Sequence, residues 1–304
     1  MVDAVVVSAD SRAMVTRCLD HLPRSVHPIV IDNGGTDGTA AALADRATTI
    51  HLDTPSGLAT AFNRGTAAGR ADLVLFLNDD VFATEGAIER LVAELEARPD
   101  AVAAGGRLVD ADTLETQARY LPAPFPTPAR LGLRLSGLRS LRSERPDPEL
   151  LANTSETIDT TQPAGACLLV RRTVLERIGG WDERFFFWYE DVDICRRLCG
   201  EGAVLYVPAA AFRHQGGASF ARKDREWSLR AMFHGSLQYA GAHFSRGGRA
   251  GLGATVALLA LPRVAAFTIA RRPALARLYR DVARASLALA RGRPVPPLSR
   301  PASD

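Results

Sequence analysis

Residues 72–80 read DLVLFLNDD, an apolar run that ends in an amide and two carboxylates. A short apolar run bounded by polar residues is typical of a β-strand that is buried on both faces of a sheet. Helical patterns precede and follow it, at 58–69 and 84–97, and Pro99 ends the second helix. A strand placed between helices is the repeating unit of an α/β sheet.

The same alternation extends toward the N-terminus. Residues 4–8 (AVVVS) and 27–32 (HPIVID) are compact apolar runs, and 11–22 carries apolar side chains at helical spacing. A further helix is expected over 38–47, with a short strand at 48–52. The order predicts a doubly wound α/β domain with a mixed sheet, in which ligands bind at the carboxyl ends of the strands.

The pattern changes after residue 120. Residues 121–160 hold six prolines before residue 150 and show no clear period, so we expect a long, partly mobile loop. A strand, a helix and another strand are expected between 161 and 208, and beyond about 221 the chain reads as helical. We therefore expect an α/β domain over 1–220 and a helical C-terminal region over 221–304.

Charge divides the chain in the same way. Residues 1–220 carry 22 Arg against 30 acids, a net of −8, whereas 221–304 carries 14 Arg and Lys223 against four acids, a net of +11. The use of Arg over Lys is typical of a GC-rich coding sequence, which does not explain the clustering. A basic region attached to an acidic body indicates an anionic partner such as a phospholipid surface.

Within the basic region, residues 250–270 form an apolar run that only Pro262 and Arg263 interrupt, and two arginines flank each end. Its length reaches the minimum for a bilayer span, but an arginine near its centre disfavours simple spanning. Three alternatives stay open: interfacial or re-entrant membrane contact, a buried helical hairpin, and a true span.

The cysteines and the N-terminus indicate a reducing, cytoplasmic setting. The four cysteines form no CxxC pair and no metal-finger spacing. No signal peptide precedes the first expected strand.

Two strand ends carry candidate binding residues. In IDNGGTDGT (31–39), Asp32 ends a strand before a glycine-rich turn, an arrangement that can bind a nucleoside. The alternative is an ordinary turn in which Asp37 caps the next helix. In FLNDD, the adjacent carboxylates of Asp79 and Asp80 favour a divalent cation, the alternative being a solvated turn.

The segment GGWDERFFFWYEDVDICRRL (179–198) places five aromatic residues directly before an acidic helix start. Acids in the first turn of a helix gain from its dipole and its unpaired N–H groups. A carboxylate beside an aromatic wall is partly desolvated, which raises its pKa toward that of a useful general base. The alternative is a capped helix that aromatic side chains pack against.

Taken in order, VVVS, DNGGTDGT, GLATAFNRG, LFLNDD, PAGACLLVRR, GGWDERFFFWYEDVDICRRL and HQGGAS resemble the family 2 glycosyltransferases with the GT-A fold. The resemblance covers about residues 3–220 and is strongest to the bacterial rhamnosyltransferase-like branch. It implies an inverting sugar transfer from a nucleotide-diphosphate donor, with Mg²⁺ or Mn²⁺ on the diphosphate. dTDP-rhamnose is the favoured donor and UDP-hexoses come next.

The basic, apolar C-terminal region suggests an acceptor and a location for such an enzyme. The acceptor would be a glycan or a lipid-linked cell-envelope intermediate, and the enzyme would work at the inner face of the plasma membrane. No nucleic-acid partner is expected. The expected mobile loop would lie on the acceptor side.

Carried over residue by residue, the resemblance implies a donor site in which Asp32 holds the base or ribose. The other residues expected there are Ser8, Asn33, Asp37, Asn63, Arg64 and Asp79. Asp80, helped by Asp79, would bind the metal, and His214 would reach the metal or the diphosphate. Alternatively, His214 satisfies a buried carbonyl.

For catalysis, the resemblance implies Asp191 as the general base, supported by Glu190 and Asp193. Trp181 and Asp182 would face the sugar or the acceptor, and the aromatic wall that includes Trp188 would exclude water.

The sequence departs from the family at three points. Asn78-Asp79-Asp80 stands where the family often has Asp-x-Asp, so Asn78 is not expected to be a strong metal ligand. Ala9 follows Ser8 where many relatives have Asn or His, and Gly34-Gly35 replaces the commoner Ala-Ser.

Three other functions fit the sequence less well. A nucleotidyltransferase would carry a glycine-rich, basic first loop, whereas SADSRAM (8–14) has one arginine and no glycine. A non-catalytic sugar or lipid-carrier binding subunit would have no need of Asp79, Asp80 and Asp191. A glycoside hydrolase with two carboxylates would leave the Asp32 turn without a role.

Overall fold

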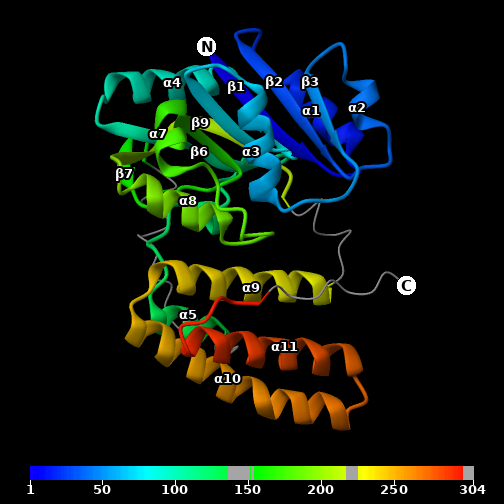
Figure 1. Ribbon diagram of the computed structural model, residues 1–304. Helices are drawn as coiled ribbons and strands as arrows, with labels where there is room; N and C mark the ends of the chain where they lie inside the picture. The colour runs from blue at the N-terminus through cyan, green and yellow to red at the C-terminus, as the bar shows by residue number, and fades with distance from the viewer. Residues whose placement is uncertain (136–150, 152–153, 217–224, 297–304) are drawn as a thin grey trace. The chain divides into compact units, whose positions relative to one another are not determined.

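The computed structural model describes residues 1–135, 151, 154–216 and 225–296 (Figure 1). The chain forms two compact units. The sheet unit comprises Met1–Phe125, Glu144–Glu183 and Glu190–Ser219. The helical unit comprises Pro126–Ser143, Arg184–Tyr189 and Phe220–Asp304.

The sheet unit is built on one nine-stranded mixed sheet with the order β3-β2-β1-β4-β8-β6-β9-β5, and β7 pairs with β9 on the side (Figure 1). The first four strands are parallel, β8 runs antiparallel to both β4 and β6, and β6 is parallel to β9. The strands are β1 (Val2–Ser8), β2 (Val26–Asn33), β3 (Thr48–Leu52), β4 (Leu73–Asn78), β5 (Val81–Ala83), β6 (Ala101–Asp110), β7 (Ile158–Thr160), β8 (Cys167–Arg171) and β9 (Ala203–His214).

Helices cover both faces of this sheet because its strands are apolar on both faces. Neighbouring residues such as Val5 and Val6 enter two different apolar clusters, as the alternation of side chains along a strand requires. The helices are α1 (Arg12–Asp20), α2 (Thr39–Ala42), α3 (Leu58–Ala68), α4 (Ala87–Ala97), α7 (Arg172–Ile178) and α8 (Glu190–Leu198), with a 3₁₀ turn η1 (Ala118–Tyr120). The doubly wound α/β prediction is confirmed.

One acid inside the first strand is a structural residue. Asp3 is 2% exposed and accepts hydrogen bonds from the Arg172 guanidinium at 2.7 Å and from the Ala71 amide at 2.7 Å, and it also pairs with His27. Burial alone would raise the pKa of Asp3, but these hydrogen bonds and charges outweigh it, and the pKa lies below its ordinary value. Asp3 therefore joins β1 to the start of α7.

The helical unit contains α5 (Pro128–Leu135), α9 (Arg225–His243), α10 (Arg246–Ile269) and α11 (Pro273–Ala290). Ser245 caps α10, since its Oγ accepts a hydrogen bond from the Gly248 amide at 3.2 Å. α10 and α11 pack along each other as an antiparallel pair (Figure 1).

The structure changes the expectation for 121–160. This stretch contains helix α5, whose Leu131 and Leu135 are buried, and strand β7. Residues 136–150 and 152–153 of the expected loop lie outside the described residues. Strands β5 and β6, which the sequence reading did not anticipate, complete the sheet.

Candidate active site

The carboxyl ends of β1, β2 and β4 meet at one edge of the sheet, which we call the polar edge. Ser8 pairs in register with Asp32, and Val7 pairs with Asn78. Parallel pairing therefore brings the acid of the IDNGG turn and the acids of FLNDD to the same edge, as predicted.

Asp32 lies at this edge with its side chain buried. The residue is 1% exposed, and its Oδ2 lies 2.9 Å from Nδ1 of His51, the residue beside it on β3. Its Oδ1 is also buried and makes no hydrogen bond to the described residues. Gly35 lies against this oxygen, where a Cβ would approach to 2.2 Å, so the turn needs glycine at this position. An acceptor left without a donor is a place where a ligand hydroxyl or N–H can bind.

Asn33 and Asp37 have structural partners. Oδ1 of Asn33 accepts a hydrogen bond from the Ser56 amide at 2.7 Å, and its Nδ2 donates to the Ser56 carbonyl. Asp37 accepts from the amides of Arg12 and Thr39, at the starts of α1 and α2. Burial raises the pKa of Asp37, but hydrogen bonds from the Thr39 hydroxyl and from these two amides outweigh that effect and lower it. The helix-capping alternative therefore describes the Asp37 carboxylate in this structure.

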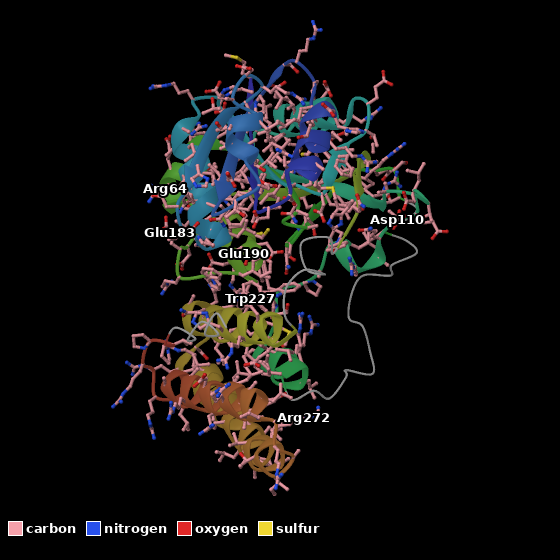
Figure 2. The ribbon with its side chains drawn as sticks, turned by 90° about the vertical axis from the view of Figure 1, so that its right-hand side faces the viewer. Arg64, Asp110, Glu183, Glu190, Trp227 and Arg272 are labelled. Carbon is pink, nitrogen blue, oxygen red and sulfur yellow. The ribbon has the colours of Figure 1, made fainter. Side chains whose placement is uncertain are left out.

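Asn63 holds a turn, and Arg64 is exposed. Oδ1 of Asn63 accepts from the Trp181 amide at 2.9 Å, while its Nδ2 donates to the Trp181 carbonyl and to Glu183, each at 2.9 Å. Asn63 thus fixes the turn after Gly180. Arg64 and Glu183 are labelled on the same side of the sheet unit in Figure 2, where Arg64 projects from α3.

Ser8 and Asp79 are linked through a residue that the sequence reading did not single out. Ser8 Oγ lies 2.8 Å from Ser11 Oγ, and Ser11 Oγ donates a hydrogen bond to Asp79 Oδ2. All three side chains are buried. The first loop is therefore tied directly to the carboxylates at the end of β4.

Asp80 and His214 meet at the polar edge. They are 4% and 2% exposed, and His214 Nε2 lies 3.5 Å from Asp80 Oδ1. That oxygen makes no hydrogen bond to the described residues. Gln117 orients the ring, since its Oε1 lies 2.8 Å from His214 Nδ1, and Tyr120 packs edge-on against it.

This pair is chemically suited to a hard divalent cation. A buried carboxylate oxygen without a donor and an imidazole nitrogen beside it are both metal-ligand groups. Among the described residues, no group of three or more His, Cys, Asp or Glu side chains is arranged around a single point. Asp80 and His214 would therefore provide part of the coordination shell of such an ion, and the other ligands would be groups of a bound substrate or water.

Trp181 is a core residue. Its indole is 2% exposed and packs against Phe62 and Phe76, with ring centroids 4.8 and 4.9 Å away. No ring face is left for a sugar, so we withdraw Trp181 from the residues expected to face the acceptor. Asp182, the next residue, is partly exposed.

Trp188 belongs to the helical unit. Its side chain is 37% exposed and its φ is +69°, a left-handed conformation that is unusual for a bulky residue. Phe187 packs against its ring, and Phe187 also contacts Trp227. The aromatic run that precedes the acids thus packs with α9 inside the helical unit.

The three acids at the start of α8 have different surroundings. Asp193 is 1% exposed and accepts a hydrogen bond from Nε of Arg197 at 2.8 Å. Arg197 in turn donates to the carbonyls of Ile178 and Gly180, so this pair supports the turn before Trp181. Asp193 therefore has a structural role.

The neighbouring acids Glu190 and Asp191 differ in burial. Glu190 is 8% exposed, its Oε2 makes no hydrogen bond to the described residues, and burial followed by the Asp191 charge raises its pKa to about 8 (Figure 2). Glu190 is therefore mostly neutral near pH 7. Asp191 is partly exposed, and its Oδ1 accepts from the Val192 amide at 2.8 Å.

The turn before β8 connects Asp191 with the end of β4. The Ala166 carbonyl accepts a hydrogen bond from the Asn78 amide at 3.1 Å. The adjacent Gly165 lies against Asp191, so closely that a Cβ would approach the Asp191 Cβ to 2.4 Å. Asp191 therefore lies at the polar edge, on the β8 side of Asp79 and Asp80.

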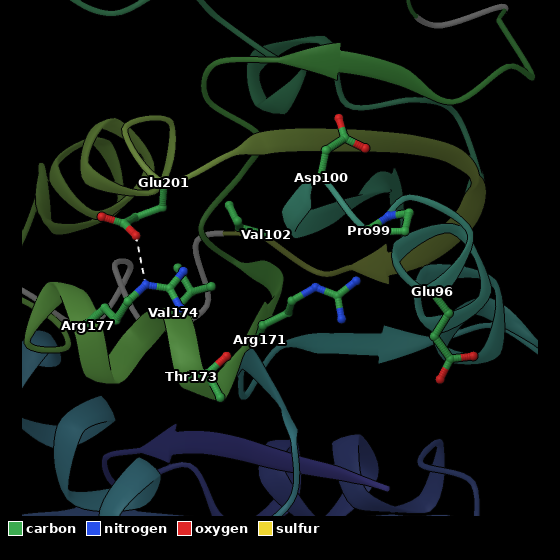
Figure 3. A pocket seen from close by; sticks show the side chains of 9 residues that line it. All are labelled: Glu96, Pro99, Asp100, Val102, Arg171, Thr173, Val174, Arg177 and Glu201. Carbon is green, nitrogen blue, oxygen red and sulfur yellow. Dashed lines mark hydrogen bonds and ion pairs between the residues drawn. The ribbon is translucent and has the colours of Figure 1, made fainter.

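One hollow in the described sheet unit lies elsewhere. It measures about 530 Å³ and is found where β6 begins and β8 ends, away from the polar edge (Figure 3). Both arginines that line it have structural partners: Arg171 donates to the carbonyls of Leu95 and Ala101, and Arg177 pairs with Glu201. We assign no function to it.

Several residues of the polar edge were missed in the sequence. Ser11, His51 and Gln117 contact the predicted residues directly, and Tyr120 packs on His214. Arg119 stacks on Tyr120 at 4.6 Å, and its guanidinium lies near the position of a Gly216 Cβ. No motif marks them, since they reach the site through the loop after β1, through β3 and through the segment after β6. The rest of HQGGAS, 217–219, lies outside the described residues.

The mixed sheet has the architecture of the GT-A fold. The model described as Glycosyl transferase family 2 matches residues 3–179, more than half of the chain, and the chain belongs to this family.

Two of the similar proteins are rhamnosyltransferases. The chain is 32% identical over 222 residues to the N-acetylglucosaminyl-diphospho-decaprenol L-rhamnosyltransferase of Mycobacterium tuberculosis, which covers 66% of this chain and 69% of that protein. It is 38% identical over 74 residues to the rhamnosyltransferase WbbL of Escherichia coli, covering 23% of this chain and 28% of that protein. These similarities agree with the predicted branch of the family.

Solved structures share the fold. GalNAc-T7, crystallised with UDP, GalNAc and Mn²⁺, aligns with a TM-score of 0.60 at 13% identity, covering 98% of this chain and 58% of that one. The mannosyltransferase PcManGT from Pyrobaculum calidifontis, in complex with GDP-Man and Mn²⁺, aligns with a TM-score of 0.51 at 18% identity, covering 96% and 85%. At these identities the likeness concerns the fold alone.

Proposed function

We propose that this glycosyltransferase transfers a sugar, with inversion, from a nucleotide-diphosphate donor to an acceptor hydroxyl. The donor nucleoside would bind at Asp32, and the diphosphate would bind beside Asp79, Asp80 and His214. Asp191 would act as the general base.

The observation that carries the proposal is the Asp80 carboxylate. Burying a charged oxygen without a donor is costly, and a bound ligand or cation would remove that cost. Asp80 Oδ1 is such an oxygen, and His214 lies beside it. Asp32 and Asp191 lie at the same edge, so one ligand site could use all of these groups.

Asp80 and His214, with help from Asp79, would hold a Mg²⁺ or Mn²⁺ ion, and the remaining ligands would come from the diphosphate and water. When bound, the ion supplies positive charge that stabilises the leaving diphosphate. Arg119 is an additional cationic group near this place, because its guanidinium lies beside Gly216 and Tyr120.

The chemical step needs one proton acceptor from the chain. The acceptor oxygen forms a bond to the anomeric carbon, the bond from that carbon to the diphosphate oxygen breaks, and Asp191 receives the hydroxyl proton. Asp191 suits this task because it is partly exposed, whereas Glu190 is buried and mostly neutral and Asp193 is paired with Arg197.

The relatives suggest the substrates. The name of the mycobacterial relative combines L-rhamnose with a decaprenol-linked acceptor. We propose a rhamnosyl donor, with dTDP-rhamnose first and UDP-hexoses next, and a lipid-linked glycan intermediate as acceptor. Such an acceptor would place the reaction in the cytoplasm, at the inner face of the plasma membrane.

The test is nucleotide release from a panel of nucleotide sugars, with Mg²⁺, Mn²⁺ or EDTA. We expect metal-dependent release of the nucleoside diphosphate, lost in Asp80→Ala and in Asp191→Asn. Asp45→Asn is the matched control, because Asp45 is an exposed acid of the same unit, and it should keep full activity. Release that is unaffected by both site variants would contradict the mechanism.

The alternatives give different products. A nucleotidyltransferase would release or consume pyrophosphate in place of a nucleoside diphosphate. A non-catalytic subunit would bind a nucleotide sugar, detectable by calorimetry, without turning it over with any acceptor.

A further inference from the structure

One face of α10 is exposed and almost wholly apolar. Three large side chains on it, Leu258, Leu261 and Ile269, are 69%, 58% and 83% exposed. The exposed positions recur every three to four residues, as one face of a helix does. Apart from Arg246, they are Gly247, Ala250, Gly251, Ala254, Thr255, Leu258, Leu261, Pro262, Ala265, Ala266, Thr268 and Ile269.

The opposite face of α10 is packed against α11. Leu252, Val256 and Ala260 are buried, and a Cβ on Gly253 would come within 2.4 Å of the Ser286 carbonyl, so the two helices are in close contact. Phe267 stacks on Tyr279 with ring centroids 5.5 Å apart. The apolar face is therefore presented by a fixed helix pair.

Exposed arginines lie at both ends of this face, and no acid lies near them in the sequence. Arg246, Arg271 and Arg272 are exposed at the two ends of α10, and Arg272 is labelled in Figure 2 at the junction of α10 and α11. Residues 246–280 contain no acid. Between 225 and 296 the acids are Glu226 and Asp281, and Arg230 pairs with both at 2.9 and 2.8 Å.

We propose that the exposed face of α10 binds an anionic phospholipid bilayer, with the helix lying in the plane of the interface. Its apolar side chains would enter the boundary between headgroups and acyl chains, while the flanking arginines contact lipid phosphates. The proposal goes beyond the sugar-transfer reaction and does not depend on it.

α10 has the length and composition of a span, with a mean hydropathy of 1.8 and 28% of its apolar window buried. Its packing argues for an interfacial position instead. α11, to which it is fixed, exposes Arg277, Arg280 and Arg284, which are costly to place in hydrocarbon.

The exposed face of α10 could instead bind a second copy of the chain. A symmetric pair joined through this face would bring the same arginines together without acids to oppose them, which is unfavourable. An anionic lipid surface matches both the apolar face and the charge around it. The observations therefore favour lipid.

The test is flotation of the full chain with vesicles, without donor or acceptor. One set of vesicles is phosphatidylcholine alone, and the other is phosphatidylcholine mixed with phosphatidylglycerol. We expect binding to the anionic vesicles that weakens as salt is raised, and little binding to the neutral ones. Absence of binding to anionic vesicles would overturn the proposal, whatever the outcome of the nucleotide-release assay.

Matched variants identify the face. Leu258→Gln should weaken partitioning about tenfold, whereas Leu114→Gln, at another exposed leucine, should not. Arg271→Gln with Arg272→Gln should weaken it about 30-fold, at roughly 1 kcal/mol for each arginine. Arg24→Gln with Arg70→Gln, two exposed arginines of the sheet unit, should have little effect.

Self-association is measured on the same samples by sedimentation without lipid. A monomer supports the proposal. A dimer that Leu258→Gln dissociates would assign the face to a second copy and contradict lipid binding.

Discussion

At the scale of single residues, the start of α8 carries three acids with three different environments. Asp191 is partly exposed, Glu190 is buried beside it, and Asp193 pairs with Arg197. We expect Asp191→Asn to lower kcat by about 10²–10⁴ and Glu190→Gln to leave most activity at neutral pH, because glutamine resembles the neutral acid. Steady-state kinetics of nucleotide release measures both. A rate that rises through a pKa near 8, and disappears in Glu190→Gln, would instead assign the base to Glu190.

Glu190 also predicts how stability depends on pH. Its pKa is raised from 4.5 to about 8 in the folded chain, so the folded state binds more protons than the unfolded state between those values. The free energy of unfolding should therefore fall as pH rises from about 5 to 8. Urea unfolding across this range should show a shallower fall for Glu190→Gln than for the wild type. Equal slopes would contradict the raised pKa.

Asp193 should matter for stability. Asp193→Asn leaves the Arg197 guanidinium without its carboxylate in a partly buried position, which we expect to cost about 2 kcal/mol of unfolding free energy. Asp100→Asn is the control, since Asp100 pairs with Arg98 at the exposed surface. Its free energy of unfolding should not change measurably. Chemical unfolding monitors both variants. If Asp193→Asn unfolds as the wild type does, the pair is not structural.

At the scale of elements, the turn before β8 positions the proposed base. Gly165→Ala would put a methyl group 2.4 Å from the Asp191 Cβ, so Asp191 must shift. A shift of about 1 Å can cost about 10²-fold in rate, so we expect a lower kcat with nearly unchanged donor binding. Gly247→Ala is the control, because nothing lies within 4 Å of its Cβ position. Kinetics and calorimetric donor binding together test this.

The elements also show what the sequence could predict. β1, β2 and β4 were predicted because they are continuous apolar runs, and the order of their polar ends identified the polar edge. β6 was missed because Gly105 and Gly106 weaken its local signal. Those glycines fit against Pro163 and Phe212, contacts that exist only in the folded chain.

The positions of the strand-end acids could be predicted from the sequence, while their roles in binding and catalysis stay predictions. Acids at strand ends are visible in a sequence, whereas the role of an aromatic residue depends on what packs around it. Trp181 was expected to face a sugar and instead fills the core between Phe62 and Phe76. Asn63 was expected at the diphosphate, and in the structure it holds the turn of Trp181. The sequence could not show this contact, because Trp181 lies 118 residues further along the chain.

At the scale of the whole molecule, the chain passes between the two units several times. Residues 126–143 and 184–189 belong to the helical unit, although both lie before residue 220. Tyr189 is 3% exposed and packs on Tyr239 of α9, and Leu131 of α5 is 1% exposed. The helical region is therefore not a simple C-terminal appendage.

A chain that ends at residue 220 should consequently be less soluble than the full chain. It would lose α9, α10 and α11 while keeping α5 and the aromatic run that pack in the same unit. We expect aggregation and dye binding to exposed apolar surface, measured by light scattering and fluorescence. A soluble, monomeric, active product of this truncation would contradict the assignment of these segments to the helical unit.

The position of β8 has a consequence for synthesis on the ribosome. β4 and β6 are both neighbours of β8 and do not pair with each other, yet β8 follows β6 by about sixty residues. At typical translation rates those residues take on the order of several seconds to appear. During that interval β4 has one unpaired edge, and β6 has neither of its partners, because β9 follows later still. Unpaired apolar strands are the condition under which chains aggregate or recruit chaperones.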